Sequence, residues 1–218
     1  YIPTQNRHLS LLRAIQSVAD QTYTNIEIVI VDDASETPVT LSNFSKKCPF
    51  PIKLLRNETP KGACFSRNLA IKHSQGEYVT GLDDDDLFLP TRIELFVSKT
   101  FQLTSKGICF AALYDSSMVS VNGVTSKKCL WLSEVATFSD LQFKNIVGNQ
   151  VFAKRTSCIE AGLFNIALPA WQDWDFWIRL SESGPLYSIM ASSYILNRDP
   201  NTTRISRNIH NIRQAFYI

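Results

Sequence analysis

Residues 26–31, Ile-Glu-Ile-Val-Ile-Val, are the stretch that most constrains the fold of this chain. The run is rich in β-branched residues and is bounded by polar ones, so it predicts a strand. Its last four residues are all apolar, as in strands that are buried on both faces. Before it, Leu9, Leu12 and Ile15 recur at helical spacing. A helix followed by a buried strand predicts an α/β fold.

The same alternation continues through the first half of the chain. We expect further strands and helices, in the order 52–55 (strand), 64–73 (helix), 78–82 (strand) and 91–103 (helix). Beyond residue 103 the pattern weakens, and short strands are expected at residues 108–113, 118–121 and 128–132, around a turn at Asn122-Gly123. The sequence thus predicts an α/β chain with a mainly parallel, Rossmann-like sheet covered by helices, and a mixed second half.

Length and composition favour one globular domain that spans residues 1–218. The 218 residues are 44% hydrophobic and 19% charged, enough to bury a single core. No repeat, low-complexity tract or Pro/Gly-rich linker divides the chain. The formal net charge is only +2, and Lys and Arg are spread along the chain, which argues against nucleic acid as a partner.

The sequence carries no mark of export or of membrane insertion. No apolar run approaches the roughly 20 residues that cross a bilayer, and the first residues lack the order of a signal peptide. We therefore expect a cytoplasmic protein. Five cysteines without the close paired spacing of a zinc site are expected to be reduced thiols. The chain opens at Tyr1 without an initiator Met, so we expect its first strand to be cut short or to lie partly outside this sequence.

Four consecutive aspartates, Asp83 to Asp86, follow the predicted strand at residues 78–82. Carboxylates this close repel one another unless water or a cation compensates their charge. Ligands of open α/β sheets bind beyond the carboxyl ends of the strands, where this run is expected to lie. Because aspartate oxygens are hard ligands, the run predicts a site for Mg²⁺ or Mn²⁺ and, through the metal, for a diphosphate. The alternative is a solvated turn that caps the following helix.

A second acidic group lies in the aromatic stretch at residues 171–180. Trp174, Trp177 and Ile178 fall at helical spacing, which predicts a helix packed on the core and explains the aromatic residues without a function. The carboxylate of Asp173 has two interpretations. It is either a helix cap, because Asp is favoured at that position, or a catalytic group.

Together these segments resemble the family 2 inverting glycosyltransferases, which have the GT-A fold. Residues 3–7 (Pro-Thr-Gln-Asn-Arg) resemble the family's P-T-Y-N-R, with Gln5 in place of Tyr, and residues 30–35 resemble its V-V-D-D-G-S. The positions from Arg56 to Val79 resemble N-x-G…A-R-N…G-E-Y-I, and residues 82–86 resemble L-D-x-D-D. Residues 171–180 resemble E-D-W-D-L-W-L-R-L. The resemblance covers almost the whole chain, and the order of the motifs makes it specific.

The resemblance implies that residues 1–103 bind a nucleoside-diphosphate sugar. Pro3, Thr4 and Asp33 match the segments that contact the nucleoside, and Thr and Asp at these positions imply a UDP-sugar. Arg67 matches a position that would contact the diphosphate or the base, although a plain surface arginine is the equal alternative.

The aspartate run matches the family's metal and sugar-nucleotide ligands. Asp85 would be the direct ligand of Mn²⁺ or Mg²⁺, with Asp83 as a further ligand. Asp83 and Asp84 would also lie close to the ribose and the sugar.

Residues 104–218 would bind the acceptor and carry the catalytic base. Asp173 matches the family's general base, which takes the proton of the attacking hydroxyl, and Asp175 is its nearest rival. Two positions depart from the family: Gln172 replaces the usual Glu, and Pro200 stands where a metal-binding His is common. His210 is expected to be an ordinary surface residue, although another loop path would make it a ligand.

The implied acceptor is a hydroxyl of a saccharide or of a lipid-linked saccharide, bound within residues 115–150. The implied setting is bacterial surface polysaccharide or lipopolysaccharide synthesis, with peripheral attachment to the inner membrane. Two other classes stay open. One is a non-catalytic module that binds nucleotide sugars. The other is a nucleotidyltransferase, which should show a Gly-rich phosphate loop that the N-terminal region of this chain lacks.

Overall fold

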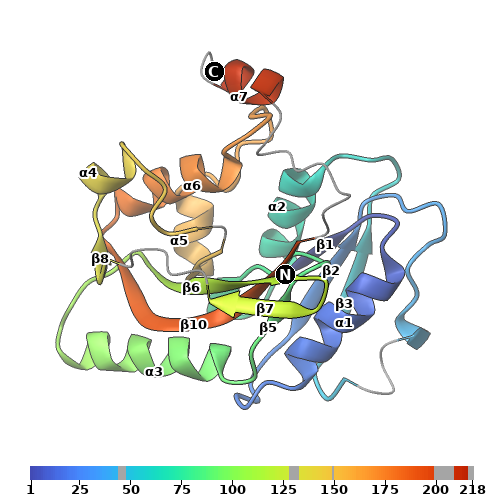
Figure 1. Cartoon of the computed structure of the whole chain (residues 1–218), viewed down its shortest axis with the longest axis horizontal. Coiled ribbons are helices and arrows are strands. Elements are labelled where there is room, and N and C mark those ends of the chain that lie inside the picture. Colours follow the sequence, from blue (N-terminus) through green and yellow to red (C-terminus); the bar gives the residue numbers. More distant parts are fainter. Residues whose placement is uncertain (44–47, 128–132, 149, 199–208, 216–218) are drawn as a thin grey trace.

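The computed structural model describes residues 1–43, 48–127, 133–148, 150–198 and 209–215. A three-stranded sheet is built from β1 (Ile2–Thr4), β2 (Ile28–Asp32) and β3 (Ile52–Arg56). All three strands run parallel, with Ile2 opposite Ile30 and Ile28 opposite Ile52 (Figure 1). The first half of the chain therefore has the parallel sheet that its alternating pattern predicts.

A second sheet is mixed. Its strands follow the order β4 (Tyr78–Thr80), β9 (Phe152–Lys154), β6 (Ala112–Val121), β10 (Leu186–Arg198) and β5 (Leu87–Phe88). Two further strands pair at its margins, β7 (Val124–Lys127) with β6 and β8 (Val135–Ala136) with β10. Within the described strands of this sheet, β6 and β10 form the parallel pair and the other pairs are antiparallel. This is the mixed second half that the sequence predicts.

Two backbone hydrogen bonds place β1 beside the end of β4. The Tyr1 amine donates to the Thr80 carbonyl at 2.9 Å, and the Leu82 amide donates to the Tyr1 carbonyl at 3.0 Å. This is the bonding pattern of parallel strands. The carboxyl ends of β2, β1 and β4 therefore lie at one edge, and the aspartate run begins there.

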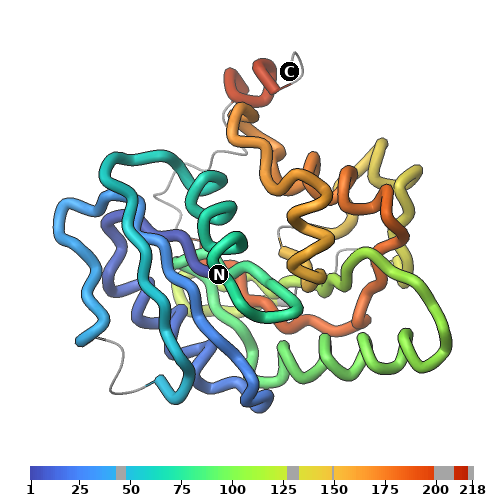
Figure 2. The backbone as a smooth tube through the Cα atoms, turned by 180° about the vertical axis from the view of Figure 1, so that it is seen from behind, coloured from blue at the N-terminus to red at the C-terminus, as the bar shows by residue number. Residues whose placement is uncertain are grey.

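Helices cover both faces of the sheets (Figures 1 and 2). α1 (His8–Ala19) and α3 (Arg92–Ser105) lie on the face to which β2 presents Ile28 and Ile30. The opposite face is covered by α2 (Ala63–His73), α5 (Arg155–Glu160) and α6 (Gln172–Ser181). There Ala70 of α2 packs on Val29 and Val31. Because successive residues of a strand point to opposite faces, the whole apolar run of β2 is buried.

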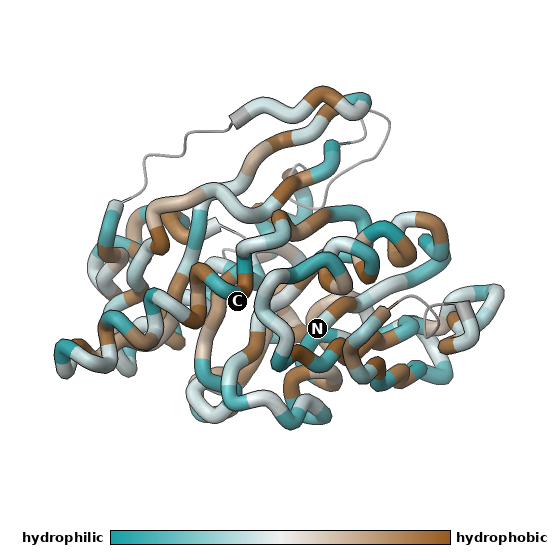
Figure 3. The backbone as a smooth tube through the Cα atoms, turned by 90° about the horizontal axis from the view of Figure 1, so that it is seen from below, coloured by the Kyte–Doolittle hydropathy of each residue, from teal (hydrophilic) through white to brown (hydrophobic). Residues whose placement is uncertain are grey.

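The helices pack through amphipathic faces. Apolar and polar segments alternate along the helical tubes in Figure 3, and in α1 the buried residues are Leu11, Ala14, Ile15 and Val18. Three short helices complete the described chain: a 3-10 helix at Leu41–Asn43, α4 (Phe138–Leu141) and α7 (Ile209–Ala215). Among the described helices, none combines the length and the apolar character that a membrane span requires.

A buried ion pair ties α3 to the second sheet. Arg92 Nη1 lies 2.5 Å from Asp115 Oδ2 of β6, and both side chains are almost inaccessible to solvent. The same oxygen accepts hydrogen bonds from the amide and the hydroxyl of Ser193 in β10, at 3.0 and 2.6 Å. The guanidinium also lies over three aromatic rings, those of Phe88, Phe96 and Tyr194.

The predicted elements of the first half are confirmed, with their ends within two residues of the observed bounds. In the second half, one strand, β6, takes the place of the two strands expected at residues 108–113 and 118–121, and residues 108–111 lie outside it. The predicted turn joins β6 to β7, and Asn122 and Gly123 have the positive φ values, 50° and 80°, that such a hairpin needs. The strand expected at residues 128–132 lies outside the described residues. The sequence did not predict β9, β10 or α5.

Candidate active site

The aspartate run forms a tight loop between β4 and β5. The Asp86 amide donates to the Asp83 carbonyl at 3.0 Å and closes the turn. Asp84 and Asp86 are buried, whereas the Asp85 side chain is 44% exposed. α3 begins only after β5, with Thr91 at its N-cap. The alternative of a solvated turn that caps the next helix is therefore wrong.

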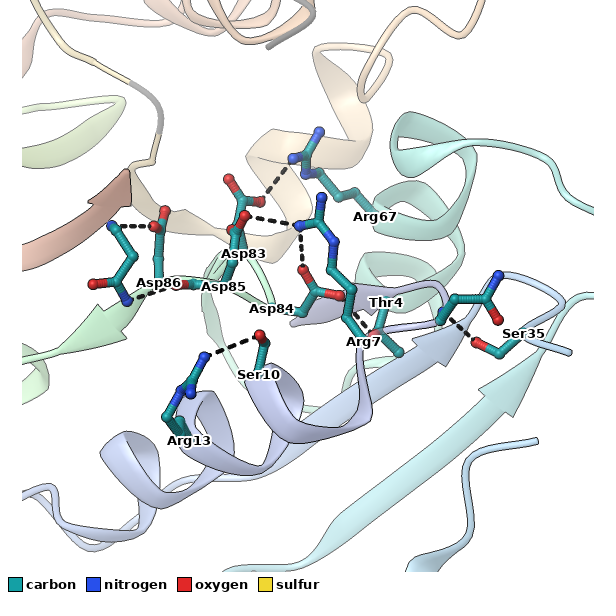
Figure 4. A network of polar contacts seen from close by, with 12 residues as sticks. Thr4, Arg7, Ser10, Arg13, Ser35, Arg67, Asp83, Asp84, Asp85 and Asp86 are labelled. Atoms are coloured by element: carbon teal, nitrogen blue, oxygen red, sulfur yellow. Dashed lines mark hydrogen bonds and ion pairs between the residues drawn. The ribbon is translucent and has the colours of Figure 1, made fainter. Parts of the chain in front are cut away.

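Two arginines from different elements neutralise the run (Figure 4). Arg7 precedes α1, and its Nη1 lies 3.1 Å from Asp84 Oδ1 and 2.8 Å from Asp85 Oδ2. Arg67 of α2 places Nη2 2.8 Å from Asp83 Oδ1. Protein cations therefore supply much of the compensation that adjacent carboxylates require. The motifs do not reveal Arg7 as a partner of the run, because 77 residues separate it from Asp84.

β1 reaches the same place through Thr4. Its Oγ1 donates to Asp84 Oδ2 at 2.7 Å. Pro3 is buried beside it and lies opposite Val31 of β2. Burial raises the pKa of Asp84, and the bonds from Thr4 and Arg7 oppose that rise. The structure thus brings Pro3, Thr4 and Asp84 together, next to the pair of Arg67 and Asp83.

Asp33 follows β2, and its side chain stabilises the loop before α2. Its carboxylate accepts hydrogen bonds from Asn57 Nδ2 at 2.6 Å and from the amides of Lys61 and Gly62, both at 2.8 Å. These bonds hold the loop before α2, where Gly62 has a φ of 87° that glycine adopts without strain. An ionised carboxylate has about four acceptor positions, so one more donor fits. A contact from Asp33 to a nucleoside base stays a prediction.

Asp86 fastens the run to β10. Its Oδ2 accepts from the Tyr194 hydroxyl at 2.9 Å, and its Oδ1 accepts from the Asn197 amide at 2.8 Å. Burial, together with the charges of Asp83 and Asp85, raises the pKa of Asp86 to about 8. No sequence motif predicts these contacts, because Tyr194 and Asn197 lie 108 and 111 residues after Asp86 in the chain.

The oxygen atoms of the run fit a divalent cation that takes its remaining ligands from a diphosphate. Asp83 and Asp85 offer hard oxygen ligands. In the part of the chain that the structure describes, no group of three or more His, Cys, Asp or Glu is arranged to hold a metal. Mg²⁺ is commonly held by one or two carboxylates with substrate phosphates, and two aspartates match that pattern. Pro200 lies outside the described residues, and His210 is exposed on α7, which projects away from the sheets (Figures 1 and 2).

Asp173 is the second residue of α6 and does not cap it. The N-cap is Trp171, whose side chain makes no capping bond, so the interpretation of Asp173 as the N-cap residue is wrong. Asp173 Oδ1 accepts from the following backbone amide at 2.9 Å, and Oδ2 lies 3.5 Å from Asn145 Nδ2. Burial raises the pKa of Asp173, while the charge of Arg67 lowers it and that of Asp83 raises it. The predicted base and the donor-side residues therefore lie within electrostatic reach of one another.

Asp175, the rival base, is engaged elsewhere. Its Oδ2 pairs with Arg179 Nη2 at 2.6 Å, one helical turn further on. Arg179 also donates to the Leu163 carbonyl at 2.7 Å, which anchors α6 to the preceding loop. Gln172, which replaces the usual Glu, donates Nε2 to a backbone carbonyl of that loop at 2.8 Å. The geometry favours Asp173 as the candidate base.

A cavity of about 680 Å³ lies at the other end of the strands. Its lining includes Ile28 and Val29 of β2, Tyr78 and Val79 of β4, and Thr100 of α3. Ligands of α/β sheets bind beyond the carboxyl ends of the strands, and this cavity lies at the amino ends. We therefore place the candidate site at the aspartate run.

Relatives of known family agree with the fold and the motifs. Residues 1–152 match the profile of a family described as glycosyl transferase family 2. WcaA of Escherichia coli (strain K12), named for glycosyl transfer in colanic acid biosynthesis, is 37% identical over 202 residues, which cover 90% of this chain and 71% of WcaA. WfaP of Escherichia coli, named UDP-Glc:alpha-D-GlcNAc-diphosphoundecaprenol beta-1,3-glucosyltransferase, is 30% identical over 178 residues, which cover 80% of this chain and 66% of WfaP.

A solved structure agrees on the fold. The crystal structure of S. aureus TarS 1–349 with UDP-GlcNAc matches at a TM-score of 0.75 and 18% identity, over 94% of this chain and 59% of that chain. At this identity the likeness concerns the fold alone, and it confirms the predicted GT-A type. This chain spans from 59% to 71% of the length of these three proteins. Because the family profile matches most of the chain and WcaA is 37% identical to it, the protein belongs to glycosyl transferase family 2.

Proposed function

We propose that this protein transfers a sugar, with inversion, from a UDP-sugar to a hydroxyl of a saccharide or a lipid-linked saccharide. Family membership supports glycosyl transfer itself. WfaP is named for a UDP-Glc donor and a diphosphoundecaprenol-linked acceptor, and TarS is known in complex with UDP-GlcNAc. WcaA is named for colanic acid biosynthesis, which supports a role in the synthesis of a bacterial polysaccharide. We place this role in surface polysaccharide or lipopolysaccharide assembly at the cytoplasmic face of the membrane as part of the proposal.

The observation that carries the proposal is the approach of two acidic centres from the two halves of the chain. Asp83 follows β4 in the first half, and Asp173 lies on α6 in the second. Arg67 pairs with Asp83 and also acts on Asp173 through its charge. An inverting transfer needs a base on the acceptor side of the sugar and charge stabilisation on the side of the leaving group. The two centres are suited to these tasks.

Different residues assist the two sides of the reaction, the attack of the acceptor and the departure of UDP. Asp173 takes the proton of the acceptor hydroxyl while the hydroxyl oxygen bonds to the anomeric carbon. The bond from that carbon to the diphosphate breaks on the opposite face, so the configuration inverts and UDP leaves. Arg7 and Arg67 provide positive charge where we place the diphosphate. Bound Mn²⁺ or Mg²⁺, held by Asp83 and Asp85, would neutralise further charge on the diphosphate.

Nucleoside binding is assigned to the ends of the two central parallel strands. Pro3 and Thr4 end β1, Asp33 follows β2, and these strands are neighbours. Asp84 is bonded to Thr4, which would place it close to the ribose and the sugar.

A panel of nucleotide sugars with Mn²⁺ present tests the donor. We expect slow hydrolysis of a UDP-sugar, measured as released UDP, and no comparable hydrolysis of GDP-sugars. Release from GDP-sugars alone would overturn the assignment of the nucleotide.

Asp173→Asn tests the base. The variant keeps the size of the side chain but cannot accept the proton, so kcat should fall by a factor of about 10² to 10⁴ while UDP affinity hardly changes. Asp175→Asn is the matched control, because it makes the same change at a residue that is paired with Arg179, and it should keep a near-normal rate. The reverse order of rates would assign the base to Asp175.

A non-catalytic module is the second candidate, because Gln172 replaces Glu and its amide is used to hold the preceding loop. It predicts that the wild-type protein binds UDP but consumes no UDP-sugar with any acceptor. The family match does not favour the nucleotidyltransferase class.

A further inference from the structure

Asn145 and Gln150 each contact one of the two acidic centres. Asn145 Nδ2 lies 3.5 Å from Asp173 Oδ2, and Gln150 Nε2 lies 3.5 Å from Asp83 Oδ1. Building on the proposed function, we propose that Asn145 and Gln150 are positioning residues of the transfer. Asn145 orients the base, and Gln150 orients the aspartate at the donor end. Neither residue belongs to one of the motifs in the sequence.

Asn145 is held in one orientation by its own loop. Its Oδ1 accepts hydrogen bonds from the amides of Val147 and Gly148, at 3.2 and 3.0 Å. Its Nδ2 donates to the Gly148 carbonyl at 3.1 Å, and the same carbonyl accepts from Trp177 Nε1 of α6 at 2.9 Å. The loop is thereby fastened to the helix that carries Asp173. One amide hydrogen of Asn145 is thus donated to the Gly148 carbonyl, and the loop holds the side chain so that Nδ2 can direct the other toward Asp173.

The contact from Asn145 to Asp173 is long for a hydrogen bond, as is common for catalytic contacts before a substrate is bound. The effect of this contact on Asp173 follows from its chemistry. An amide donor stabilises the ionised form of a carboxylate, and the ionised form is the one that can accept a proton. The other groups that act on Asp173 include Arg67 and Cys64 of α2 and Asp83 of the aspartate run. On its own helix they include the backbone amides of Trp174 and of Asp173 itself.

Gln150 is buried, with a side chain that the fold does not fully satisfy. Only 4% of the residue is exposed, and its Oε1 has no hydrogen-bond partner within the described part of the chain. A buried acceptor without a partner lowers stability, so packing alone does not explain a glutamine here. Its Nε2 shares Asp83 Oδ1 with Arg67. A role in holding Asp83 explains why an amide occupies this position.

Gly81 makes room for this arrangement. A Cβ at position 81 would lie 2.0 Å from Gln150 Oε1, so any side chain there would displace the amide. Gly81 therefore leaves the space in which the Gln150 amide can contact Asp83, the first residue of the aspartate run.

Asn145→Asp tests the first half of the proposal. The aspartate still accepts the two loop amides, but it loses the donor and brings a second negative charge to Asp173. We expect the acid limb of the kcat–pH profile to move to higher pH, with kcat lowered roughly tenfold near neutrality and recovering at higher pH. UDP affinity should stay unchanged. A loop residue with a purely structural role would lower kcat at every pH alike.

Asn165→Asp is the matched control. Asn165 accepts the Ala167 amide at 3.0 Å in a similar local turn, outside the contacts described for the site, so the same substitution should leave the pH profile in place. If Asn145→Asp does not fold, Asn145→Ser keeps an acceptor for the loop amides, removes the donor and should shift the acid limb in the same direction. An unmoved acid limb in a folded Asn145 variant overturns the assignment.

Gln150→Met tests the second half. Methionine has a similar length and no polar group, so it removes both the donor to Asp83 and the unsatisfied Oε1. We expect UDP affinity with Mn²⁺, measured by calorimetry, to fall about three- to tenfold. Urea denaturation should show unchanged or higher stability, and the acid limb should not move. A loss of stability with unchanged UDP affinity would show a structural role and overturn the proposal, and Gln150→Leu answers the same question if the Met variant does not fold.

Failure of this inference is distinguishable from failure of the proposed function. If the wild-type protein consumes no UDP-sugar, the proposed function fails. If the wild type transfers sugar but the variants change neither the pH profile nor UDP affinity, the positioning roles alone fail.

Discussion

At the scale of single residues, four identical aspartates occupy four different environments. Asp83 is paired with an arginine, and Asp84 is buried against a threonine hydroxyl. Asp86 is buried against a tyrosine hydroxyl, whereas Asp85 is the most accessible of the four. Burial disfavours the ionised form of a carboxylate, and it raises the pKa of Asp84 and of Asp86. Of the four, Asp83 and Asp85 are best placed to meet a charged ligand.

The accessible positions of Asp83 and Asp85 predict how UDP binding depends on a divalent cation. Removing the cation with a chelator should weaken UDP binding at least about tenfold, because a diphosphate then meets the carboxylates with Arg7 and Arg67 as the counter-charges paired with the run among the described residues. Asp85→Ala should remove most of this dependence and leave the fold intact. Calorimetry with and without chelator measures it, and equal affinity in both conditions would contradict the metal role of the run.

The raised pKa of Asp173 predicts two effects of pH. The base acts only when ionised, so kcat should fall on acidification at a higher pH than the ordinary aspartate pKa of about 3.9 would give. The same shift means that the folded state favours the protonated carboxyl. This group therefore adds stability at low pH and loses that contribution as the pH rises through its folded pKa. Asp173→Asn should then be more stable than the wild type at pH 7 while nearly inactive, and urea denaturation at pH 7 measures this.

Motifs identified only part of the candidate site. Asp83 and Asp173 could be singled out because each follows or begins a strongly patterned element. Arg7 also stands in a motif, but its contact with Asp84 spans 77 residues and no local pattern encodes it. Asn145 and Gln150 lie in a loop without periodicity, so only the folded arrangement identifies them.

At the scale of elements, the strands of the first half were predictable because their apolar runs are continuous. β10 was not, although it has 13 residues. Its pairing with β6 shifts register between Ser188 and Ser192 and again before Tyr194. Met190 in this stretch has a positive φ of 54°. A bulge of this kind breaks the period of two that identifies a strand, so the sequence shows no alternation there.

A contact between elements gives a prediction for catalysis. Asn68 of α2 donates Nδ2 to the Phe164 carbonyl at 2.8 Å and accepts the Phe164 amide at 2.9 Å. These two bonds hold the loop that leads into α6 and Asp173. Asn68→Ala should lower the free energy of unfolding by about 1–3 kcal/mol and lower kcat more than UDP affinity. Asn68→Asp keeps only the accepted bond, so its effects should be intermediate, and larger effects in Asp than in Ala would contradict this account.

At the scale of the whole molecule, the second sheet holds α3 through the buried pair of Arg92 and Asp115. Arg92→Met should cost about 3–5 kcal/mol of unfolding free energy, because it leaves the buried Asp115 carboxylate without its cation. Glu94→Gln, at an exposed position of the same helix, is the control and should change stability by less than about 0.5 kcal/mol. Urea denaturation measures both, and equal effects would show that the pair does little for the fold.

The contribution of the buried Arg92–Asp115 pair to stability should depend on temperature. Hydration of charged groups carries a strongly negative entropy, so the cost of removing Arg92 and Asp115 from water falls as temperature rises. The attraction between them does not weaken in the same proportion, and the pair should therefore contribute more to stability in warm solution than in cold. The loss caused by Arg92→Met should be larger at about 35 °C than at about 10 °C when both are measured by urea denaturation. This contact would then matter most near the upper limit of the temperature range in which the protein stays folded.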